Sequence, residues 1–459
     1  MNNILKVESL DQSRPKLFEK IAYGMGDAGC NIVGGAVFLF LNFFYTDVYG
    51  LSAFTVGLIW FGVRLIEAIS DPFIGSVADR TETRWGKFRP YILFFALPYS
   101  VFTILMYTVP DLSYNAKAMY AFVTFLLMSV TYSFINIPYC ALGSVMSYNA
   151  EDRVSCQSYR FMGVGIATLI LTLTLIPLVE WLGAGDQAKG YQYTIIILTI
   201  LGFILFLMCF LFTKERVKPI VENKDPFMTN LKDCLRNDQW LRLLLLTFVN
   251  VLPGFIRMGA VLYFLNYIMH VSTIYITVFL SVGVIGMILG SALAKPLSDR
   301  FCKLRIFYSI SIVLFIYSFG LYFVNPDLHI LYLILYFGLN VIHQIAQPIN
   351  WSIMGDVDDY GEIKVGKRLT GMNFSFNFLA LKLGLTTSGV AINFLLSFSD
   401  YQPNVIHQNS VAEHTILLLF TVIPAVGYLL TAFCVRLLKV DRKMMFEIEK
   451  QLKIRRGNI

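Results

Sequence analysis

Apolar runs of roughly 20 residues recur from one end of this chain to the other, and they limit its possible folds more than any other feature. A run of that length crosses the hydrocarbon core of a bilayer as an α-helix, which bonds all of its backbone polar groups internally. Only 15% of the 459 residues are charged, against about a quarter in an ordinary soluble protein. The sequence therefore predicts an all-α polytopic membrane protein that sits in a lipid bilayer.

Twelve spans can be counted. They are predicted at residues 21–46, 54–77, 90–110, 118–147, 155–180, 191–213, 241–269, 272–296, 305–324, 328–355, 369–397 and 414–438. Of the 37 lysines and arginines, only Lys117 and Lys189 fall in loops between an odd-numbered span and the next even-numbered one. By the positive-inside rule, the other loops and both termini are expected to be cytoplasmic. The net charge of +7 is then a signal of topology, and no nucleic-acid partner is needed to explain it.

A polar segment in the middle of the chain separates six spans from six. There is also an internal echo, because GSVADRTETRWGKFRPY follows the second span and AKPLSDRFCKLRIFY follows the eighth, with Asp79 and Asp299 220 residues apart. Two similar six-helix halves are typical of transporters, which bind substrate between the halves. We expect an N-terminal half at 1–213, a central cytoplasmic loop at 214–240, and a C-terminal half with a cytoplasmic tail at 241–459.

The second span contains the stretch VRLIEAISDPFIG, which carries three charges inside an apolar segment. Arg64, Glu67 and Asp71 lie on one stripe of a helix. Each would cost about 2.5–3.5 kcal/mol if it met lipid unpaired, so the stripe must face the protein interior or water. Glu67 and Asp71 are one turn apart and repel each other, so the pair favours binding a proton or a small cation, and Arg64 can compensate one carboxylate. The alternative is a structural ion-pair network that holds helices together.

Other polar side chains lie in spans that could converge on this stripe. A lone lysine, Lys382, stands in the eleventh span and needs an acidic partner, for which Glu67 and Asp71 are the candidates. Further polar residues stand in the first, fourth and fifth spans, namely Asp27, Asn31, Ser133, Asn136 and Arg160. Together with neighbouring aromatic residues such as Trp351, these side chains suit a sugar. The alternative for most aromatic residues is a place in the lipid-facing belt.

The order and spacing of several motifs resemble a known family. VRLIEAISDPFIG is followed by RWGKFRPYIL and preceded by FYTDVYGLS, and MGDVDDYGEIK lies near Asp356. These stretches are similar to the glycoside–pentoside–hexuronide:cation symporter family, the melibiose permease group of the major facilitator superfamily. The resemblance covers nearly the whole chain. It implies the twelve-helix fold of that superfamily and secondary active uptake of a sugar or glycoside with a proton, sodium or lithium ion. We expect the protein to act as a monomer in a bacterial inner membrane.

The resemblance also implies roles for individual residues. Glu67, Asp71, Ser133 and Lys382 match the family's cation site, and Glu67 and Asp71 are where a sodium ion would bind. Arg160 matches an arginine that closes over the sugar, so that Asp27, Asn31, Asn136, Arg160 and Trp351 form the expected substrate site. Arg153, Asp356 and Asp359 match cytoplasmic charges that pair when the transporter faces outward, with Arg300 as another partner for the aspartates.

The chain departs from the melibiose branch at three places. Cys30 and Asn31 stand where that branch has a Lys-Asp pair, and Asn136 stands where it has an aspartate. Ser70 replaces an asparagine before the second acid of the stripe, which favours a proton over sodium. A melibiose-like galactoside is therefore not the expected substrate.

Two alternatives to this interpretation are open. The cytoplasmic charges could set topology alone, with DVDDYGE a solvated helix end. A lysolipid or drug transporter on the same fold would use a wide apolar cavity instead of a sugar site. No nucleophile elbow, metal-ligand cluster or phosphate-binding loop stands in the sequence, so neither an enzyme nor a bound cofactor is expected.

Overall fold

The computed structural model describes residues 14–218, 225–402 and 408–455, and its named elements there are all helices. In chain order they are α2 (Leu17–Phe43), η1 (Phe44–Val48), α3 (Ala53–Arg80), α4 (Arg89–Met106), α5 (Tyr114–Val145), α6 (Ala150–Gly183), α7 (Gln187–Phe212), α8 (Phe227–Arg236), α9 (Asp238–Tyr267), α10 (Thr273–Arg300), α11 (Lys303–Leu321), α12 (His329–Val365), α13 (Thr370–Phe398), α14 (Ser410–Phe420), α15 (Val422–Leu437) and α16 (Arg442–Arg455). The all-α prediction is confirmed for the described residues.

Eleven stretches of helix among the described residues are long and apolar enough to cross a membrane. The predicted span that falls short is α3, because five charged residues lie along its 28 residues. The outer face of α3 is nevertheless apolar, and its exposed side chains follow one another every fourth residue, at Phe61, Leu65, Ile69, Phe73 and Val77. We therefore keep α3 as the proposed twelfth span, with its acidic residues turned inward.

The tenth predicted span is longer than the apolar pattern suggested. Helix α12 continues to Val365, ten residues beyond the predicted end at 355. The continuation contains four acidic residues, Asp356, Asp358, Asp359 and Glu362, and each is at most 5% exposed. The alternative that DVDDYGE is a solvated helix end is therefore wrong, because these acidic side chains are buried.

The last predicted span is interrupted at Thr421, between α14 and α15. Pro424 has no N–H to donate to the carbonyl of Phe420, so the helix leaves that acceptor free. The Nε of Arg257 on α9 donates to this carbonyl over 3.0 Å, and its Nη2 donates to Ser318 Oγ over 2.6 Å. Arg257, which lies in an otherwise apolar part of its predicted span, thus binds a backbone carbonyl that Pro424 leaves without a donor.

The chain divides by its packing into two units. Unit 1 is Met1–Lys232 with Gly366–Ser375, and unit 2 is Asp233–Val365 with Phe376–Ile459. The division falls inside the predicted central loop and again inside α13, whose first turn belongs to unit 1. The sequence echo has a structural counterpart, because α3 and α10 have the same length and bounds 220 positions apart. Both begin after a serine, Ser52 or Ser272, whose side chain accepts a hydrogen bond from a backbone N–H in the first turn.

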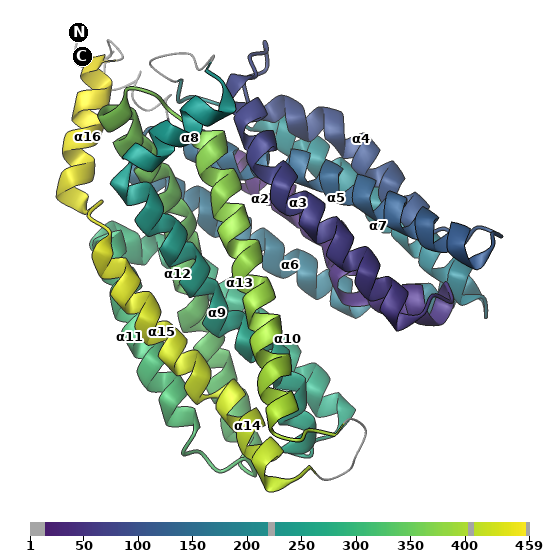
Figure 1. Ribbon diagram of the computed structural model, residues 1–459. Coiled ribbons are helices and arrows are strands. Elements are labelled where there is room, and N and C mark those ends of the chain that lie inside the picture. The colour runs from purple at the N-terminus through teal and green to yellow at the C-terminus, as the bar shows by residue number, and fades with distance from the viewer. Residues whose placement is uncertain (1–13, 219–224, 403–407, 456–459) are drawn as a thin grey trace. The chain divides into compact units, whose positions relative to one another are not determined.

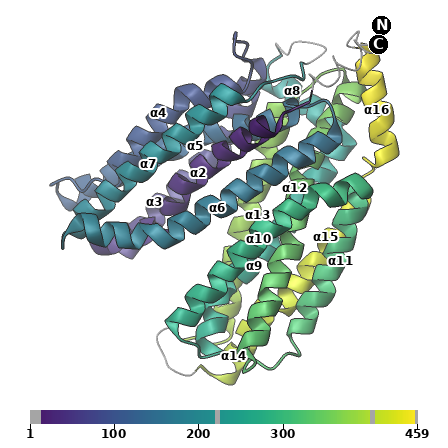
Figure 2. The same ribbon diagram turned by 180° about the vertical axis from the view of Figure 1, so that it is seen from behind.

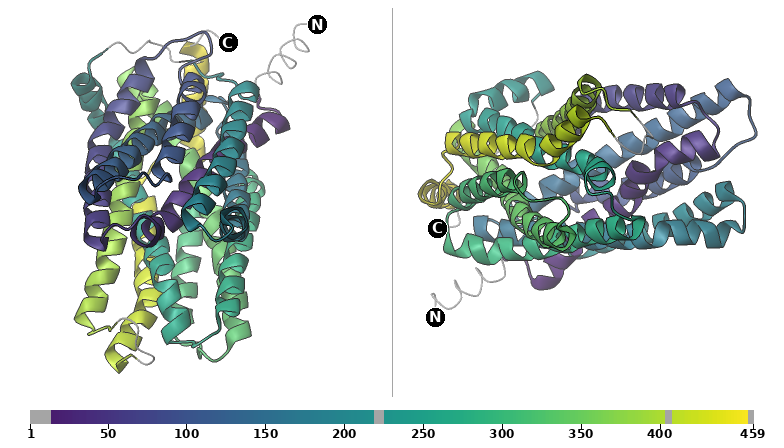
Figure 3. Two further views of the ribbon diagram at one scale, coloured as in Figure 1. Left: turned by 90° about the vertical axis from the view of Figure 1, so that its right-hand side faces the viewer. Right: turned by 90° about the horizontal axis from the view of Figure 1, so that it is seen from below.

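Each unit is a bundle of helices that lie side by side (Figure 1, Figure 3). In unit 1, α2 packs against α6 and α7, α4 packs against α5 and α7, and α3 packs against α5. In unit 2, α10 packs against α12, α11 packs against α15, and α9 packs against α15, as the view from behind shows (Figure 2). The candidate site residues of unit 1 lie on the inner faces of α2, α3, α5 and α6.

A short segment after α7 joins the ends of several helices of unit 1. The carboxylate of Glu215 accepts hydrogen bonds from the backbone N–H groups of Lys87, Phe88 and Arg89, over 2.8, 2.8 and 2.9 Å. It therefore satisfies N–H groups at the start of α4 that have no partner within the helix. The next residue, Arg216, pairs with Glu19 of α2 over 2.7 Å. Because this segment binds both α2 and α4, it fixes the ends of those helices together.

We expect Glu215→Ala to destabilise the protein, because hydrogen bonds to a charged group are worth about 1.5–3 kcal/mol each and three backbone donors lose their acceptor. The melting temperature of the purified protein in detergent should fall clearly. Glu82→Ala is the matched control, because Glu82 lies in the loop before α4 but only approaches Lys87 at 4.0 Å with its side chain 46% exposed. Equal melting temperatures for the two variants would contradict this role of Glu215.

Candidate functional site

The charged stripe of α3 forms an ion pair within itself. Arg64 Nη1 donates to Glu67 Oε2 over 2.6 Å, and the Arg64 guanidinium lies 5.1 Å from the centre of the Trp60 ring. Glu67 and Asp71 are buried, while the Arg64 side chain is 44% exposed. The prediction that Arg64 compensates one carboxylate of the stripe is confirmed, and that carboxylate is Glu67.

The second contact of Glu67 comes from a residue that the sequence did not single out. Ser129 Oγ on α5 donates to Glu67 Oε1. Ser133, the residue that the family resemblance suggested, is buried one turn further along α5, and no hydrogen bond joins it to Glu67 within the described residues. Ser133 thus stays a predicted member of the cation site, whereas Ser129 contacts the acid directly.

The register between α3 and α5 explains why Ser129, and not Ser133, contacts Glu67. At the start of the two helices, Ser52 N donates to Tyr114 OH over 3.1 Å, and this pair is separated by 62 positions. Glu67 and Ser129 are separated by the same 62 positions. The helices therefore run parallel in constant register. A side chain in a helix leans toward the helix N-terminus, so Glu67 reaches the earlier of the two serines.

A second buried cluster joins α2 to α6. Arg160 Nε donates to Asp27 Oδ2 over 2.5 Å, and both side chains are at most 6% exposed. Asn31 Nδ2, one turn after Asp27, donates to the other carboxylate oxygen over 3.1 Å. Glycines allow this approach: a Cβ on Gly24 would lie 2.6 Å from the carbonyl oxygen of Tyr159, and a Cβ on Gly163 would lie 2.7 Å from that of Gly24. Small residues thus bring the two backbones close enough for the ion pair.

Further side chains fix the orientation of Arg160. Its Nη1 donates to Gln157 Oε1 over 3.2 Å, and the guanidinium lies 5.5 Å from the centre of the Tyr139 ring and 5.2 Å from that of Phe161. Tyr139 is itself fixed, because its hydroxyl donates to the backbone carbonyl of Tyr23 over 2.6 Å. Gln157 was missed in the sequence, and its only signal there is a position three residues before Arg160 on the same helix face.

Asn136 on α5 belongs to the same cluster. Its Nδ2 donates to Tyr132 OH over 2.7 Å. The thiol of Cys140, one turn later, donates to Asn136 Oδ1 over 3.4 Å, and the ring of Tyr139 on the same helix lies 5.5 Å from the Arg160 guanidinium. Unit 1 therefore brings together four of the five predicted substrate residues, Asp27, Asn31, Asn136 and Arg160. The fifth, Trp351, lies in unit 2, where its buried ring is 5.4 Å from that of Phe378.

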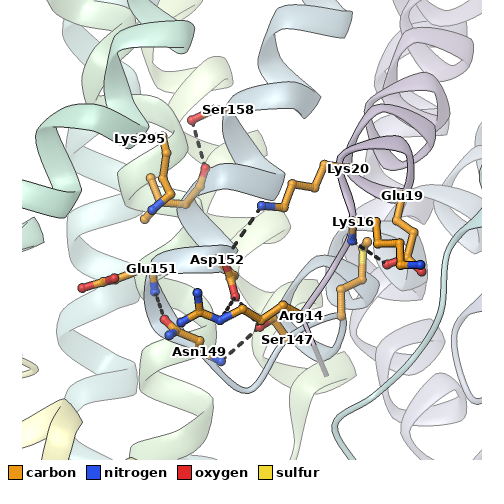
Figure 4. A network of polar contacts seen from close by, with 12 residues as sticks. Arg14, Lys16, Glu19, Lys20, Ser147, Asn149, Glu151, Asp152, Ser158 and Lys295 are labelled. Atoms are coloured by element: carbon orange, nitrogen blue, oxygen red, sulfur yellow. Dashed lines mark hydrogen bonds and ion pairs between the residues drawn. The ribbon is translucent and has the colours of Figure 1, made fainter. Parts of the chain in front are cut away.

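The predicted charges at the ends of the helices lie in both units. In unit 1, Arg153 is fully buried and its Nε donates to the backbone carbonyl of Ser147 over 3.3 Å. The preceding Asp152 has Arg14 and Lys20 within 3.7 and 3.8 Å (Figure 4). The pairing of Arg153 with an aspartate of α12 stays a prediction.

In unit 2, the described contacts of Asp356 come from another residue, and its pairing with Arg300 stays a prediction. Lys303, the first residue of α11, donates to Asp356 Oδ2 over 2.7 Å and to Ser352 Oγ over 2.8 Å. Arg300 is the last residue of α10 and is exposed. Asp359 is buried on α12, and Lys382 is partly buried on α13. The proposed pairing of Lys382 with the acids of α3 stays a prediction.

Asp79, at the end of α3, binds the first turn of α13. Its two carboxylate oxygens accept hydrogen bonds from Gly371 N over 2.7 Å and Met372 N over 2.9 Å. The backbones touch, because a Cβ on Gly75 would lie 2.3 Å from the carbonyl oxygen of Gly371. The Asp-Arg echo marked Asp79 in the sequence, but nothing there indicated that it caps a helix about 290 residues away in the chain.

Comparison with known proteins identifies the family. The family model described as MFS/sugar transport protein matches residues 22–442. The chain belongs to this family. It is 41% identical to an inner membrane symporter, YicJ, of Escherichia coli strain K12 over 414 residues, which cover 90% of both chains. It is 32% identical to the isoprimeverose transporter of Lactiplantibacillus pentosus, with 94% of this chain and 91% of the relative covered.

Solved structures agree in fold. The Escherichia coli fucose:proton symporter matches with a TM-score of 0.67 at 13% identity, over 92% of this chain and 98% of that one. A proton:xylose symporter matches with a TM-score of 0.59 at 12% identity, over 91% of this chain and 93% of that one. The predicted major facilitator superfamily fold and the resemblance on which it rested are confirmed, and the protein is an integral membrane protein.

The contact between Ser129 and Glu67 predicts which serine supports the acidic stripe. Ser129→Ala removes a hydrogen bond to a charged group, worth about 1.5–3 kcal/mol, so we expect cation-dependent sugar uptake to fall by about tenfold or more. Ser133→Ala, the matched change one turn away, should retain more of that uptake than Ser129→Ala. If Ser133→Ala lost more uptake than Ser129→Ala in vesicles with equal expression, Ser133 and not Ser129 would be the serine that supports the acidic stripe.

Proposed function

We propose that this protein is a secondary active symporter, which carries a sugar or glycoside together with a proton or sodium ion across a bacterial inner membrane. The observation that supports this most is the presence of two separate buried clusters in one bundle. One is the acidic stripe of α3, suited to a cation, and the other is the group of amides, phenols and one ion pair on α2, α5 and α6, suited to hydroxyl groups. The names of its relatives, an inner membrane symporter and an isoprimeverose transporter among them, support the same proposal.

Coupling depends on the charge of the stripe. Arg64 pairs with Glu67, and the stripe carries a second carboxylate, Asp71. Two carboxylates one turn apart repel each other by about 3 kcal/mol at an effective dielectric of about 20, and a bound cation removes that repulsion. The occupied site is then close to neutral, so it can be exposed first to one side of the membrane and then to the other at little electrostatic cost. We take the proton as the first candidate, because Ser70 replaces the amide expected of a sodium site.

Alternating access requires the two halves of such a transporter to move against each other. The contact of Asp79 with the first turn of α13 is a candidate latch for one state, because the rest of α13 belongs to unit 2. Release of that carboxylate from Gly371 and Met372 would free α13 to move with unit 2. Arg153 and Asp359 are proposed to add ion pairs to the same latch, on the cytoplasmic side where both termini are proposed to lie.

The class of substrate is tested by counterflow. Vesicles that contain the purified protein are loaded with unlabelled compound, and entry of the labelled compound is measured for a panel of pentosides, glycosides and hexuronides and, in parallel, for lysolipids. We expect exchange of at least one sugar and none of the lysolipids. Exchange of lysolipids alone would replace this proposal by the second candidate, a lipid transporter on the same fold, which has no use for the buried amide cluster.

Asp71→Asn tests the cation site, because it fixes the stripe in its neutral state. We expect the variant to bind sugar within about threefold of the wild type and to exchange it, while the accumulation ratio in energised vesicles falls to about one. Asp299→Asn is the matched control, since Asp299 is a partly exposed acid at the end of α10. Accumulation by Asp71→Asn with normal cation dependence would show that the stripe is a structural ion pair and would move the coupling site elsewhere, with Asp27 the next candidate.

A further inference from the structure

The charges in the cluster on α2, α5 and α6 indicate which charge the substrate can have. We propose that the transported sugar is an uncharged glycoside or pentoside and that hexuronides are rejected. This inference rests on the proposed function, because it concerns the substrate of the same site. It names a narrower class than sugars in general, and it follows from the way in which Asp27 and Arg160 are held.

The cluster has no net charge. Within the described part of unit 1, its charged members are one carboxylate, Asp27, and one guanidinium, Arg160, and they bind each other over 2.5 Å. The second oxygen of Asp27 is occupied as well, by the Asn31 amide. The remaining members are amides, phenols and thiols. A site of this kind offers no uncompensated positive charge to an acidic sugar.

Arg160 is also held in place on its other sides. Gln157 accepts a hydrogen bond from it, and the rings of Tyr139 and Phe161 lie at 5.5 and 5.2 Å. A hexuronide carboxylate could take the full charge of the guanidinium only by displacing Asp27. That exchange would leave Asp27 buried, 4% exposed, without its cation, which is strongly unfavourable. Asp27 therefore acts against acidic substrates, as a repulsive element that sets specificity.

The same cluster is well suited to neutral hydroxyl groups. Asn31 and Tyr132 are its partly exposed members, and Asn136 lies beside them, bonded to Tyr132 over 2.7 Å. Amides and phenols both donate and accept hydrogen bonds, as sugar hydroxyls do, so each can pair without a change of charge. A site built to bond hydroxyl groups discriminates strongly against a ligand that leaves its polar groups unpaired.

The test uses two probes that differ at one carbon. 4-Nitrophenyl glucoside and 4-nitrophenyl glucuronide share ring and aglycone, and they differ in a CH₂OH against a carboxylate at C6. Both anomers of each, with the xyloside that lacks this carbon, are used as competitors for the labelled sugar that exchanges best in vesicles with the wild-type protein. We expect the neutral competitors to act at concentrations at least about tenfold lower than the glucuronide of the same anomer.

Asp27→Asn then tests whether Asp27 is the reason that the glucuronide is rejected. The variant leaves Arg160 without its anionic partner, so we expect the ratio of glucuronide to glucoside affinity to rise by about tenfold or more. Glu19→Gln is the matched control, because it removes the carboxylate of another arginine pair, Glu19–Arg216, outside the cluster. In Glu19→Gln, the ratio of glucuronide to glucoside affinity should equal that of the wild type. The double variant Asp27→Asn/Arg160→Gln has a neutral pair again and should reject the glucuronide as the wild type does.

The possible failures are distinct. If no sugar of the panel exchanges, neutral or acidic, the proposed function is wrong and this inference fails with it. If sugars exchange but the wild type takes the glucuronide as readily as the glucoside, the proposed function stands and the inference is overturned. An unchanged ratio in a folded Asp27→Asn protein would likewise overturn it. The wild-type ratio decides the substrate class even if the variants do not fold.

Discussion

A charge inside the hydrocarbon core must be compensated by the protein around it, and the structure of each unit depends on how this is done. An unpaired charged side chain at the centre of a bilayer costs about 2.5–3.5 kcal/mol on insertion scales, and the pairs Arg64–Glu67 and Asp27–Arg160 avoid that cost. Where a carboxylate is absent, a backbone carbonyl takes its place, as Phe420 does for Arg257. Close packing through glycines makes the compensation possible, since α2 and α6 must nearly touch before Arg160 reaches Asp27.

This constraint separates the charges that are fixed in a pair from those that are suited to a mobile ion. Asp27 and Arg160 are bound to each other and fixed by Gln157 and Tyr139, an arrangement that favours a rigid, neutral site. On α3, Arg64 and two carboxylates share one stripe, which we propose as the site of the mobile ion. The two clusters share α5, which carries Ser129 for the stripe and Asn136 for the polar cluster. A change at one cluster can thereby reach the other through a single helix.

The sequence predicted those features that depend on local periodicity. The spacing of Arg64 and Glu67 on one helix face was sufficient to predict their ion pair, and the echo of 220 residues indicated two similar halves, in which the structure gives α3 and α10 equivalent bounds. Apolar run length placed the spans, but it missed the last ten residues of α12, because acidic side chains buried in protein look polar in the sequence. The break at Thr421 was also missed, although Pro424 was its signal.

Features that depend on register between helices could not be predicted. Ser129 rather than Ser133 contacts Glu67 because of a 62-residue offset between α3 and α5, which no local pattern contains. Lys303 reaches Asp356 because the chain turns between α10 and α11. Glu215 and Asp79 each bind backbone N–H groups of a distant helix, and a sequence does not show which helix end lacks an acceptor. The family resemblance supplied the candidate site residues, and the structure supplied the side chains and backbone groups that they contact.

The central claim is that sugar and cation cross together because the stripe of α3 is neutralised by the cation. The most direct measurement is cation movement driven by sugar alone, in proteoliposomes with no imposed ion gradient, followed by an internal pH dye and by labelled sodium. The account predicts that an inward sugar gradient draws protons or sodium ions inward with it in the wild-type protein. Full sugar counterflow with no movement of either cation would contradict the account and would leave Glu67 and Asp71 as a structural feature of α3.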